Sequence, residues 1–199
     1  MATTQVATLF DAEIENSPGS PGVLLSVEDL EWAVPQLVDF RSPVAREIDW
    51  QYIQGEIGVA LPQDFMELSD WYPSFAVDEF LSVHIPDPGM EQYFVRGVRG
   101  QLEVLSRLRD TGRSLGYVPF PESSGLFPWG DSIDGDYFYW RTGVLESEPW
   151  TILVRGANDD WCEYNGSLTE YLAGLVRGTV PPEGLPPDFP GPAPVIDVD

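Results

Sequence analysis

Carboxylate side chains in two short segments come nearest, in type and spacing, to supporting chemistry in this chain. They are Asp131, Asp134, Asp136, Asp159, Asp160 and Glu163. Paired carboxylates can act as general acid and base, or they can bind a metal ion. A calcium-binding loop that began at Asp131 would, however, place Ile133 where an oxygen ligand is needed. Asp134-Gly135 is a strong hairpin-turn signal without any metal, so we expect no metal site and keep a metal-dependent hydrolase only as an alternative.

The chain is also poor in the residues of nucleophilic and cofactor chemistry. His84 is its only histidine, and it lies in an expected strand beside Pro86, so we interpret it as a core or surface residue rather than as the base of a catalytic triad. Cys162 is its only cysteine, and its acidic neighbours disfavour a reactive thiolate because negative charge raises the pKa of a thiol. A phosphate-binding P-loop needs a lysine, and all ten basic residues are arginine. We therefore expect no catalytic residue, no cofactor and no zinc site.

The strong negative charge limits the partners that the chain can bind. Acidic residues outnumber basic ones 33 to 10, which gives a formal net charge of −23. Such a molecule is repelled by nucleic-acid phosphates and by anionic membrane surfaces, whereas a basic protein is attracted to it. No apolar stretch approaches the roughly 20 residues of a membrane span, and the first residues do not read as a secretory signal. With a single cysteine, a reducing compartment is expected, and we predict a cytoplasmic protein.

Aromatic side chains concentrate in the segments that we expect to form strands. They are Trp129, Tyr137, Phe138, Tyr139, Trp140, Trp150 and Trp161. Because side chains alternate along a strand, Tyr137 and Tyr139 share one face, while Phe138 and Trp140 share the other. If helices cover both faces, all these rings belong to the core. If one face stays open, it presents an aromatic patch rimmed by aspartates, which is typical of a protein-binding surface.

Hydrophobic periodicity and turn residues predict an α+β fold with an antiparallel or mixed sheet of about four to six strands and helices packed before and after it. Helices are expected at 43–57, from Leu61-Pro62 to Pro73, at 89–112 and from Ser167 to Gly178, where Ser167 and Glu170 form a capping box. Strands are expected at 79–85, 126–130, 136–141, 150–155 and 160–164.

The two ends of the chain differ in composition from its middle. Residues 1–22 contain a run of turn and breaker residues and are expected to be a flexible tail. Residues 23–42 form an N-terminal extension in which Ser26 could open a short helix that Pro35 interrupts. Residues 179–199 are rich in proline and end in acidic residues, which predicts an extended, semi-rigid tail. The domain itself is expected at 43–178.

Several motifs occur in an order that resembles a known family. Glu56 to Phe65 reads Glu-Ile-Gly-Val-Ala-Leu-Pro-Gln-Asp-Phe, and Gly125 to Gly130 reads Gly-Leu-Phe-Pro-Trp-Gly. Further matching positions are Asp134-Gly135-Asp136, Tyr139-Trp140, Trp150, Trp161 and Ser167 to Leu172. In order and spacing these motifs resemble bacterial members of the SUKH superfamily, also called the Smi/Knr cell-wall-regulator family. The chain departs from that pattern at Asp134, which is often asparagine, and in 71–80, which lacks a Tyr-Gly-Gly motif.

The resemblance implies both a fold and a role. It implies a small sheet with helices packed on it over residues 43–178. Many bacterial members are regarded as immunity proteins that bind and neutralise toxins, often nucleases, and others are regulatory scaffolds. Neither group is known for catalysis. The resemblance therefore implies a non-catalytic protein-binding module of the toxin-antitoxin type.

Charge and aromatic content together suggest where such a module would bind. Our first hypothesis is that a sheet face and its loops dock on a basic protein, such as a toxin domain, through Trp129, Asp131, Asp134, Asp136, Tyr139, Asp159, Asp160 and Trp161. A second hypothesis is a regulatory scaffold or adaptor that uses the acidic and proline-rich ends. The third is the metal-dependent hydrolase, which would use the aspartates.

Overall fold

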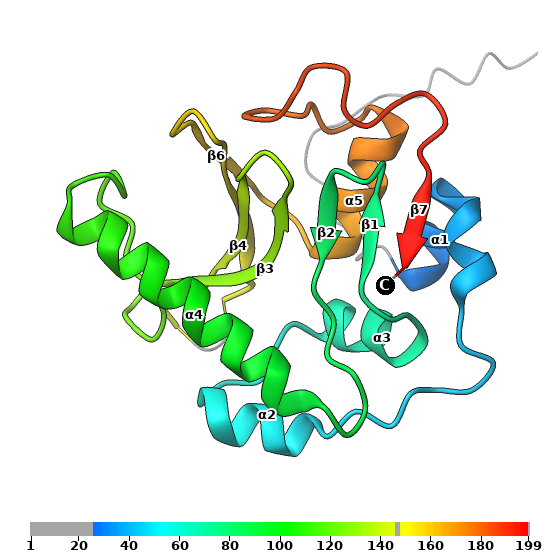
Figure 1. Ribbon diagram of the computed structural model, residues 1–199, viewed down its shortest axis with the longest axis horizontal. Coiled ribbons are helices and arrows are strands. Elements are labelled where there is room, and N and C mark those ends of the chain that lie inside the picture. The colour runs from blue at the N-terminus through cyan, green and yellow to red at the C-terminus, as the bar shows by residue number, and fades with distance from the viewer. Residues whose placement is uncertain (1–25, 146–147, 199) are drawn as a thin grey trace, which may run out of the picture.

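The computed structural model describes residues 26–145 and 148–198, which form helices around one sheet (Figure 1). The helices are α1 (Val27–Ala33), the 3₁₀ helix η1 (Pro35–Phe40), α2 (Trp50–Ile57), α3 (Gln63–Trp71), α4 (Glu91–Asp110) and α5 (Leu168–Arg177). The strands are β1 (Phe75–Val77), β2 (Leu81–Val83), β3 (Leu126–Ser132), β4 (Tyr137–Arg141), β5 (Thr151–Arg155), β6 (Trp161–Tyr164) and β7 (Ile196–Val198). The predicted α+β class is confirmed.

The strands form one seven-stranded sheet in the order β6-β5-β4-β3-β2-β1-β7, and all neighbouring pairs are antiparallel. The meander from β3 to β6 follows the predicted strands, and α5 begins at the predicted capping box of Ser167 and Glu170. The connection between the neighbouring strands β2 and β3 contains α4, so 42 residues separate Val83 from Leu126 in the chain. The sheet is wider than the four to six strands expected.

One additional strand comes from a hairpin where a single strand was expected. The predicted strand at 79–85 is wrong in its first residues, because β1 and β2 pair through a turn at Asp78 and Glu79. Both turn residues have positive φ, 53° and 51°, the backbone that a type I′ turn requires and that Asn-Gly normally supplies. The Asp78 carboxylate accepts hydrogen bonds from the N–H groups of Gly191 and Val195, which helps to hold this backbone. Both donors lie more than a hundred residues away from Asp78 in the chain.

The predicted helix over 43–57 is only half present. The helix α2 begins at Trp50, and Asp49 caps it by accepting a hydrogen bond from the Tyr52 N–H at 2.8 Å. Before Asp49 the chain is not helical, because its backbone pairs instead with the end of α3: the Arg46 N–H donates to the Asp70 carbonyl at 2.7 Å. Tertiary hydrogen bonding therefore replaces helical pairing in the first part of the predicted helix.

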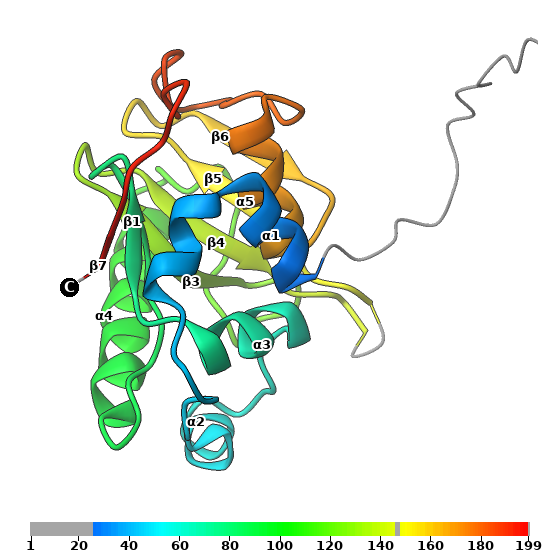
Figure 2. The same cartoon turned by 90° about the vertical axis from the view of Figure 1, so that its right-hand side faces the viewer.

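We call the face of the sheet toward α1, α3 and α5 the inner face, and Figure 2 shows these helices side by side across it. Its side chains are large, apolar and buried: Phe127, Trp129, Phe138, Trp140, Ile152 and Val154. Aromatic contacts join the layers, since Phe65 on α3 lies edge-on to Trp140 at 5.0 Å and Tyr171 on α5 lies edge-on to Trp129 at 6.3 Å. This layer is the main hydrophobic core.

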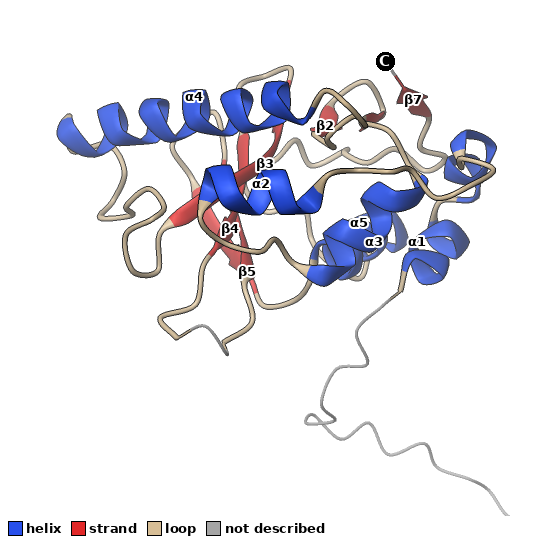
Figure 3. Ribbon diagram, turned by 90° about the horizontal axis from the view of Figure 1, so that it is seen from below, coloured by secondary structure: helices blue, strands red, loops and turns tan. Residues whose placement is uncertain are grey.

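We call the opposite face the outer face, and α4 is the helix that lies on this side of the strands (Figure 3). A second, smaller apolar cluster forms there, in which Leu105 of α4 packs on Leu126, Tyr139 and Leu153. The helix crosses the sheet away from the end that carries the β3–β4 and β5–β6 turns (Figure 1). The outer face is therefore covered in its middle but not at its turn end.

The proline-rich segment does not form the extended tail that its composition predicts. Val180, Leu185, Phe189 and Ile196 are buried in the main core. Phe189 packs on Phe80 with ring centroids 4.7 Å apart, and β7 pairs with β1 at the edge of the sheet. Leu185 and Phe189 lie between the prolines and Val180 and Ile196 flank them, and the burial of these residues anchors the segment to the domain.

The N-terminal part of the described chain is likewise packed into the domain. Ser26 and Asp29 form the capping box of α1, and Pro35 begins η1, so the short interrupted helix is confirmed. Leu30 and Leu37 are buried in the main core. Residues 1–22, expected to be a tail, lie outside the described residues. Across 26–145 and 148–198, no helix has both the length and the apolar character that crossing a membrane requires.

Candidate functional site

A row of side chains crosses the uncovered end of the outer face. The register pairs Ser82 with Asp131, Asp131 with Tyr137, Tyr137 with Arg155, and Arg155 with Trp161. These five residues come from five neighbouring strands, β2 to β6, and we call them the cross-strand row. Four of them are partly exposed, and only Arg155 is buried. The row is a polar and aromatic surface on a rigid sheet.

At one end of the row, Asp131 lies beside His84. The His84 Nε2 is 3.1 Å from the Asp131 Oδ2, and both side chains are open to solvent, at 48% and 33% exposure. A histidine paired with an acid is half of a catalytic triad. Among the described residues, no serine or cysteine side chain donates a hydrogen bond to His84, so the pair has no nucleophile in place.

Towards its other end, the row contains a buried cation. The Arg155 guanidinium lies between the rings of Tyr137 and Trp161, 5.7 Å and 6.0 Å from their centroids, and it donates a hydrogen bond to Asp159. Arg113 also pairs with Asp159, at 2.8 Å. Hydrogen bonds from Arg113 and Arg155 lower the pKa of the Asp159 carboxyl. Asp159 thus neutralises Arg155, and its charge is not free for a partner.

Two exposed turns border the row at the end of the sheet. The β3–β4 turn carries Asp134 and Ile133, whose side chain is 76% exposed, and the β5–β6 turn carries Asp160, also exposed. Neither Asp134 nor Asp160 has an ion-pair partner in the part of the chain that the structure describes. These two carboxylates are therefore free to attract a basic surface.

The remaining aspartate of this end is structural. Asp136 is 2% exposed, its Oδ1 accepts a hydrogen bond from the Ala157 N–H at 2.7 Å, and its Oδ2 accepts one from the Ser132 hydroxyl. It therefore ties the β3–β4 turn to the β5–β6 turn. The expectation that Asp136 lies in the binding surface is wrong, because burial keeps it from any partner.

The same correction applies to two aromatic residues of the expected surface. Trp129 is 1% exposed and packs against Phe138 and Tyr171 in the main core. Tyr139 is fully buried under Leu105 of α4, where burial raises the pKa of its hydroxyl. Both residues lie on strands that helices cover. Of the aromatic residues expected to bind, only Trp161 reaches the surface, where it stacks on Tyr117 at 4.8 Å.

Burial raises the pKa of the Cys162 thiol, and the charges of Glu183 and Asp160 raise it further. This agrees with the expectation that the thiol is not a reactive thiolate. Over 26–145 and 148–198, no three His, Cys, Asp or Glu side chains are placed to hold a metal ion together.

Sequence reasoning missed part of the site. It placed Tyr137 on the same face as Tyr139 but did not recognise that α4 covers only the latter. Sequence reasoning also treated His84 as an isolated histidine. Alternation along this part of the chain places Ser82 and His84 on the same face. Arg155 was not singled out, and an arginine within the apolar run Thr151–Arg155 is the signal that could have found it.

Comparisons with protein-family models, curated proteins and solved structures each found no match for this chain. The similarity to the SUKH superfamily is thus a resemblance of motifs and remains a prediction.

Proposed function

We propose that this protein is a non-catalytic binding module that acts in the cytoplasm as an immunity protein and neutralises a basic toxin domain. The binding surface is the cross-strand row together with its bordering turns. The observation that carries the proposal is the combination, at the uncovered end of the outer face, of exposed aromatic rings with unpaired carboxylates. Such a surface offers apolar anchors and electrostatic attraction to the same partner.

The distribution of charge supports a basic partner. Eight of the ten arginines pair with carboxylates, namely Arg41, Arg46, Arg99, Arg107, Arg109, Arg113, Arg141 and Arg155. The surplus negative charge is therefore left on carboxylates without a basic partner, Asp134 and Asp160 among them. These would accelerate the approach of a cationic protein, and the effect would weaken as salt is added.

The apolar part of the surface supports protein binding rather than attraction alone. Tyr137 and Trp161 flank the buried Arg155, and Ile133 projects from the adjacent turn. Aromatic side chains contribute strongly when an interface buries them, and rings already held by neighbours lose little conformational entropy on binding. Tyr117 holds Trp161 in this way by stacking on it.

The packing of the C-terminal segment argues against a scaffold that binds partners through its proline-rich end. A proline-reading domain needs an accessible extended segment. Leu185 and Phe189 are buried between the prolines of this segment. Deleting residues 181–199 would remove part of the core. Such a deletion therefore could not distinguish a scaffold function from toxin binding.

The test is affinity capture from the native cells with two forms of the protein that carry the same net charge. In the first, Asp134→Arg and Asp160→Arg reverse the charge beside the row. In the second, Asp39→Arg and Glu47→Arg reverse two exposed carboxylates on η1 and before α2. We expect the unaltered protein and the second form to retain one stoichiometric basic partner that the first form loses.

The captured partner is then expressed alone and together with each form. We expect it to be toxic alone and harmless with the unaltered protein or with the Asp39/Glu47 form. If both double variants lose the partner equally, the electrostatic attraction of the partner is not specific to the cross-strand row. If neither loses it, or the partner is not toxic, the proposal is wrong.

A further inference from the structure

A pocket of about 590 Å³ lies between the first half of α4, the segment that follows β2, and strand β3. Its walls are largely apolar and include Ile85, Phe94, Val98 and Pro128. Binding sites for small organic molecules are typically of this size and of this mixed character, with a few polar groups on an apolar lining. The pocket lies next to the cross-strand row, because Asp131 belongs to both.

The ionised and unpaired polar groups of this pocket are hydrogen-bond acceptors. One oxygen of Asp131 faces His84, and its other oxygen has no partner among the described residues. On the helix side, the Gln101 Oε1 is buried without a hydrogen-bond donor. Asp87 lies at the edge, where its carboxylate is paired with Arg46, and no arginine lines the pocket. An acceptor-rich lining without a cation favours a ligand that brings donors and positive charge.

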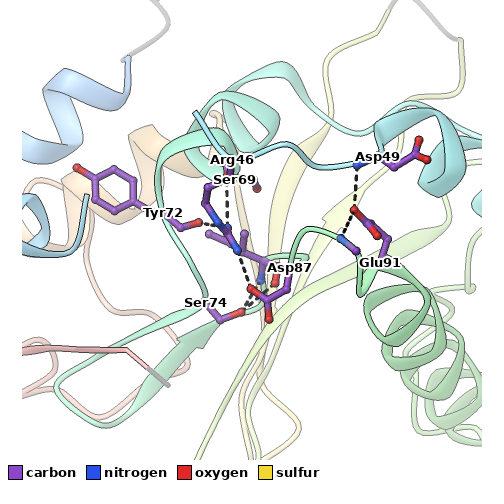
Figure 4. A network of polar contacts seen from close by, with 9 residues as sticks. Arg46, Asp49, Ser69, Tyr72, Ser74, Asp87 and Glu91 are labelled. Atoms are coloured by element: carbon purple, nitrogen blue, oxygen red, sulfur yellow. Dashed lines mark hydrogen bonds and ion pairs between the residues drawn. The ribbon is translucent and has the colours of Figure 1, made fainter. Parts of the chain in front are cut away.

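A network of polar contacts holds the walls of the pocket in place (Figure 4). Arg46 donates to the Ser69 carbonyl at 3.1 Å and to the Asp87 carboxylate at 2.6 Å. Ser74 exchanges hydrogen bonds with the backbone of Ile85, at 2.9 Å and 3.0 Å. The network fixes the loop between β2 and α4, so the pocket is formed before a ligand arrives and little ordering is needed on binding.

A glycine in the middle of α4 contributes to the space. Gly97 lines the pocket, and a Cβ atom built on it meets nothing within 4 Å. Glycine is unfavourable inside a helix, and no close packing requires it here. A larger side chain at this position would instead occupy part of the pocket. Gly100 is likewise exposed and free of close neighbours, but it does not line the pocket.

From this lining we infer that the pocket is a binding site for a small organic cation with a compact apolar body and an ammonium group. The ammonium group lies at Asp131, and the apolar body packs between Phe94, Val98 and Pro128. A charge-assisted hydrogen bond to Asp131 supplies the selectivity for a cation. The inference does not rest on the protein-binding function proposed above, although Asp131 belongs to both surfaces.

The test is an NMR titration of the full chain with tryptamine and phenethylamine, and with indole-3-propionate as an anion of similar shape to tryptamine. We expect saturable shifts from at least one amine, centred on Ile85, Val98 and His84, with a dissociation constant in the millimolar range or below. The anion should give none. The inference fails if neither amine gives a saturable shift, or if the anion binds as tightly.

Three variants locate the binding. Gly97→Leu should abolish the saturable shifts, whereas Gly100→Leu, which makes the same change to helix propensity, should preserve them. Asp131→Asn should weaken amine binding about tenfold, because the ammonium loses its charged partner. Amine binding that survives Gly97→Leu unchanged, or that Gly100→Leu removes as well, would overturn the assignment to this pocket.

Discussion

The two faces of the sheet are built from similar residue types but are completed differently. The inner face is covered by α1, α3 and α5, and its tryptophans Trp129 and Trp140 are buried. On the outer face, only the middle lies under α4. Buried polar atoms without partners among the described residues occur on both faces, among them the indole nitrogens of Trp129 and Trp140 on the inner face and the Tyr139 hydroxyl on the outer face. The faces therefore differ in cover: α1, α3 and α5 close the inner face, whereas α4 alone leaves the turn end of the outer face open.

The difference also separates stability from binding. Residues of the inner face contribute chiefly through packing, so their replacement should change folding. Residues at the turn end of the outer face have solvent on one side, so their replacement should change recognition more than folding. The predictions below test this division, from the largest expected effect to the smallest.

Trp129→Ala should lower the free energy of unfolding by about 3–5 kcal/mol, because it leaves a large cavity between the sheet and α5. Trp161→Ala should cost about 1–2 kcal/mol, since the ring is partly exposed and loses mainly its stacking on Tyr117. Urea unfolding followed by circular dichroism measures both values. Similar costs for the two tryptophans would contradict the division between the faces.

Asp136→Ala should lower the free energy of unfolding by about 1–3 kcal/mol, because the Ala157 N–H and the Ser132 hydroxyl lose a buried acceptor. Asp134→Ala, two residues away on the exposed turn, should stay within about 0.5 kcal/mol of the unaltered protein. Parallel urea unfolding of the two variants measures the difference. If Asp134→Ala costs as much as Asp136→Ala, the turn is not held by the buried carboxylate.

Glu91 ties the start of α4, the cover of the outer face, to the segment before α2. Burial by itself would raise the pKa of Glu91, but the N–H groups of Asp49 and Gly89 bond to the carboxylate, and the pKa lies below the ordinary value of 4.5. A lowered pKa in the folded state stabilises the protein above the unfolded pKa, and this stability is lost as the pH falls through the folded pKa.

Glu91→Gln should therefore cost about 1 kcal/mol at neutral pH, where the charge-assisted hydrogen bonds are replaced by neutral ones. The difference from the unaltered protein should shrink as the pH is lowered below about 4.5, the ordinary pKa of the group. Thermal unfolding from pH 7 down to about pH 3 follows it. A difference that stays constant over this range would show that the charge of Glu91 contributes nothing.

The sequence allows much of the fold to be predicted, and the misses have one physical cause. The strands β3 to β6 and the helix α5 follow from alternation, turn residues and a local capping box, all of which lie within a few residues of the element. In contrast, β1, β7 and the start of α2 depend on partners far along the chain, such as Asp78 with Val195 and Arg46 with Asp70. Sequence patterns over a few residues do not reveal such distant partners.

The candidate site could be predicted only in part for a related reason. Alternation along β4 places Tyr137 and Tyr139 on one face, but the path of α4 decides that one is a surface residue and the other a core residue. Likewise, Asp134 and Asp136 are both acidic turn residues in the sequence. Only the neighbouring turn at Ala157 makes the second one structural. The residue types can be read from the sequence, whereas which residues a helix covers depends on how the layers of the fold pack together.

The smallest expected effect concerns α4 itself. Gly100→Ala should raise the free energy of unfolding by about 0.5–1 kcal/mol, because alanine is the better helix former and the added methyl group meets no atom within 4 Å. On the inner side the same kind of change should be harmful: a Cβ atom on Gly174 of α5 would lie 2.3 Å from the Val180 Cγ2. Urea unfolding of Gly100→Ala and Gly174→Ala measures both. Opposite signs would show that the solvent side of α4 accepts a side chain at Gly100 while close packing against Val180 requires glycine at position 174 of α5. A loss of stability in both would mean that α4 also requires a glycine at position 100.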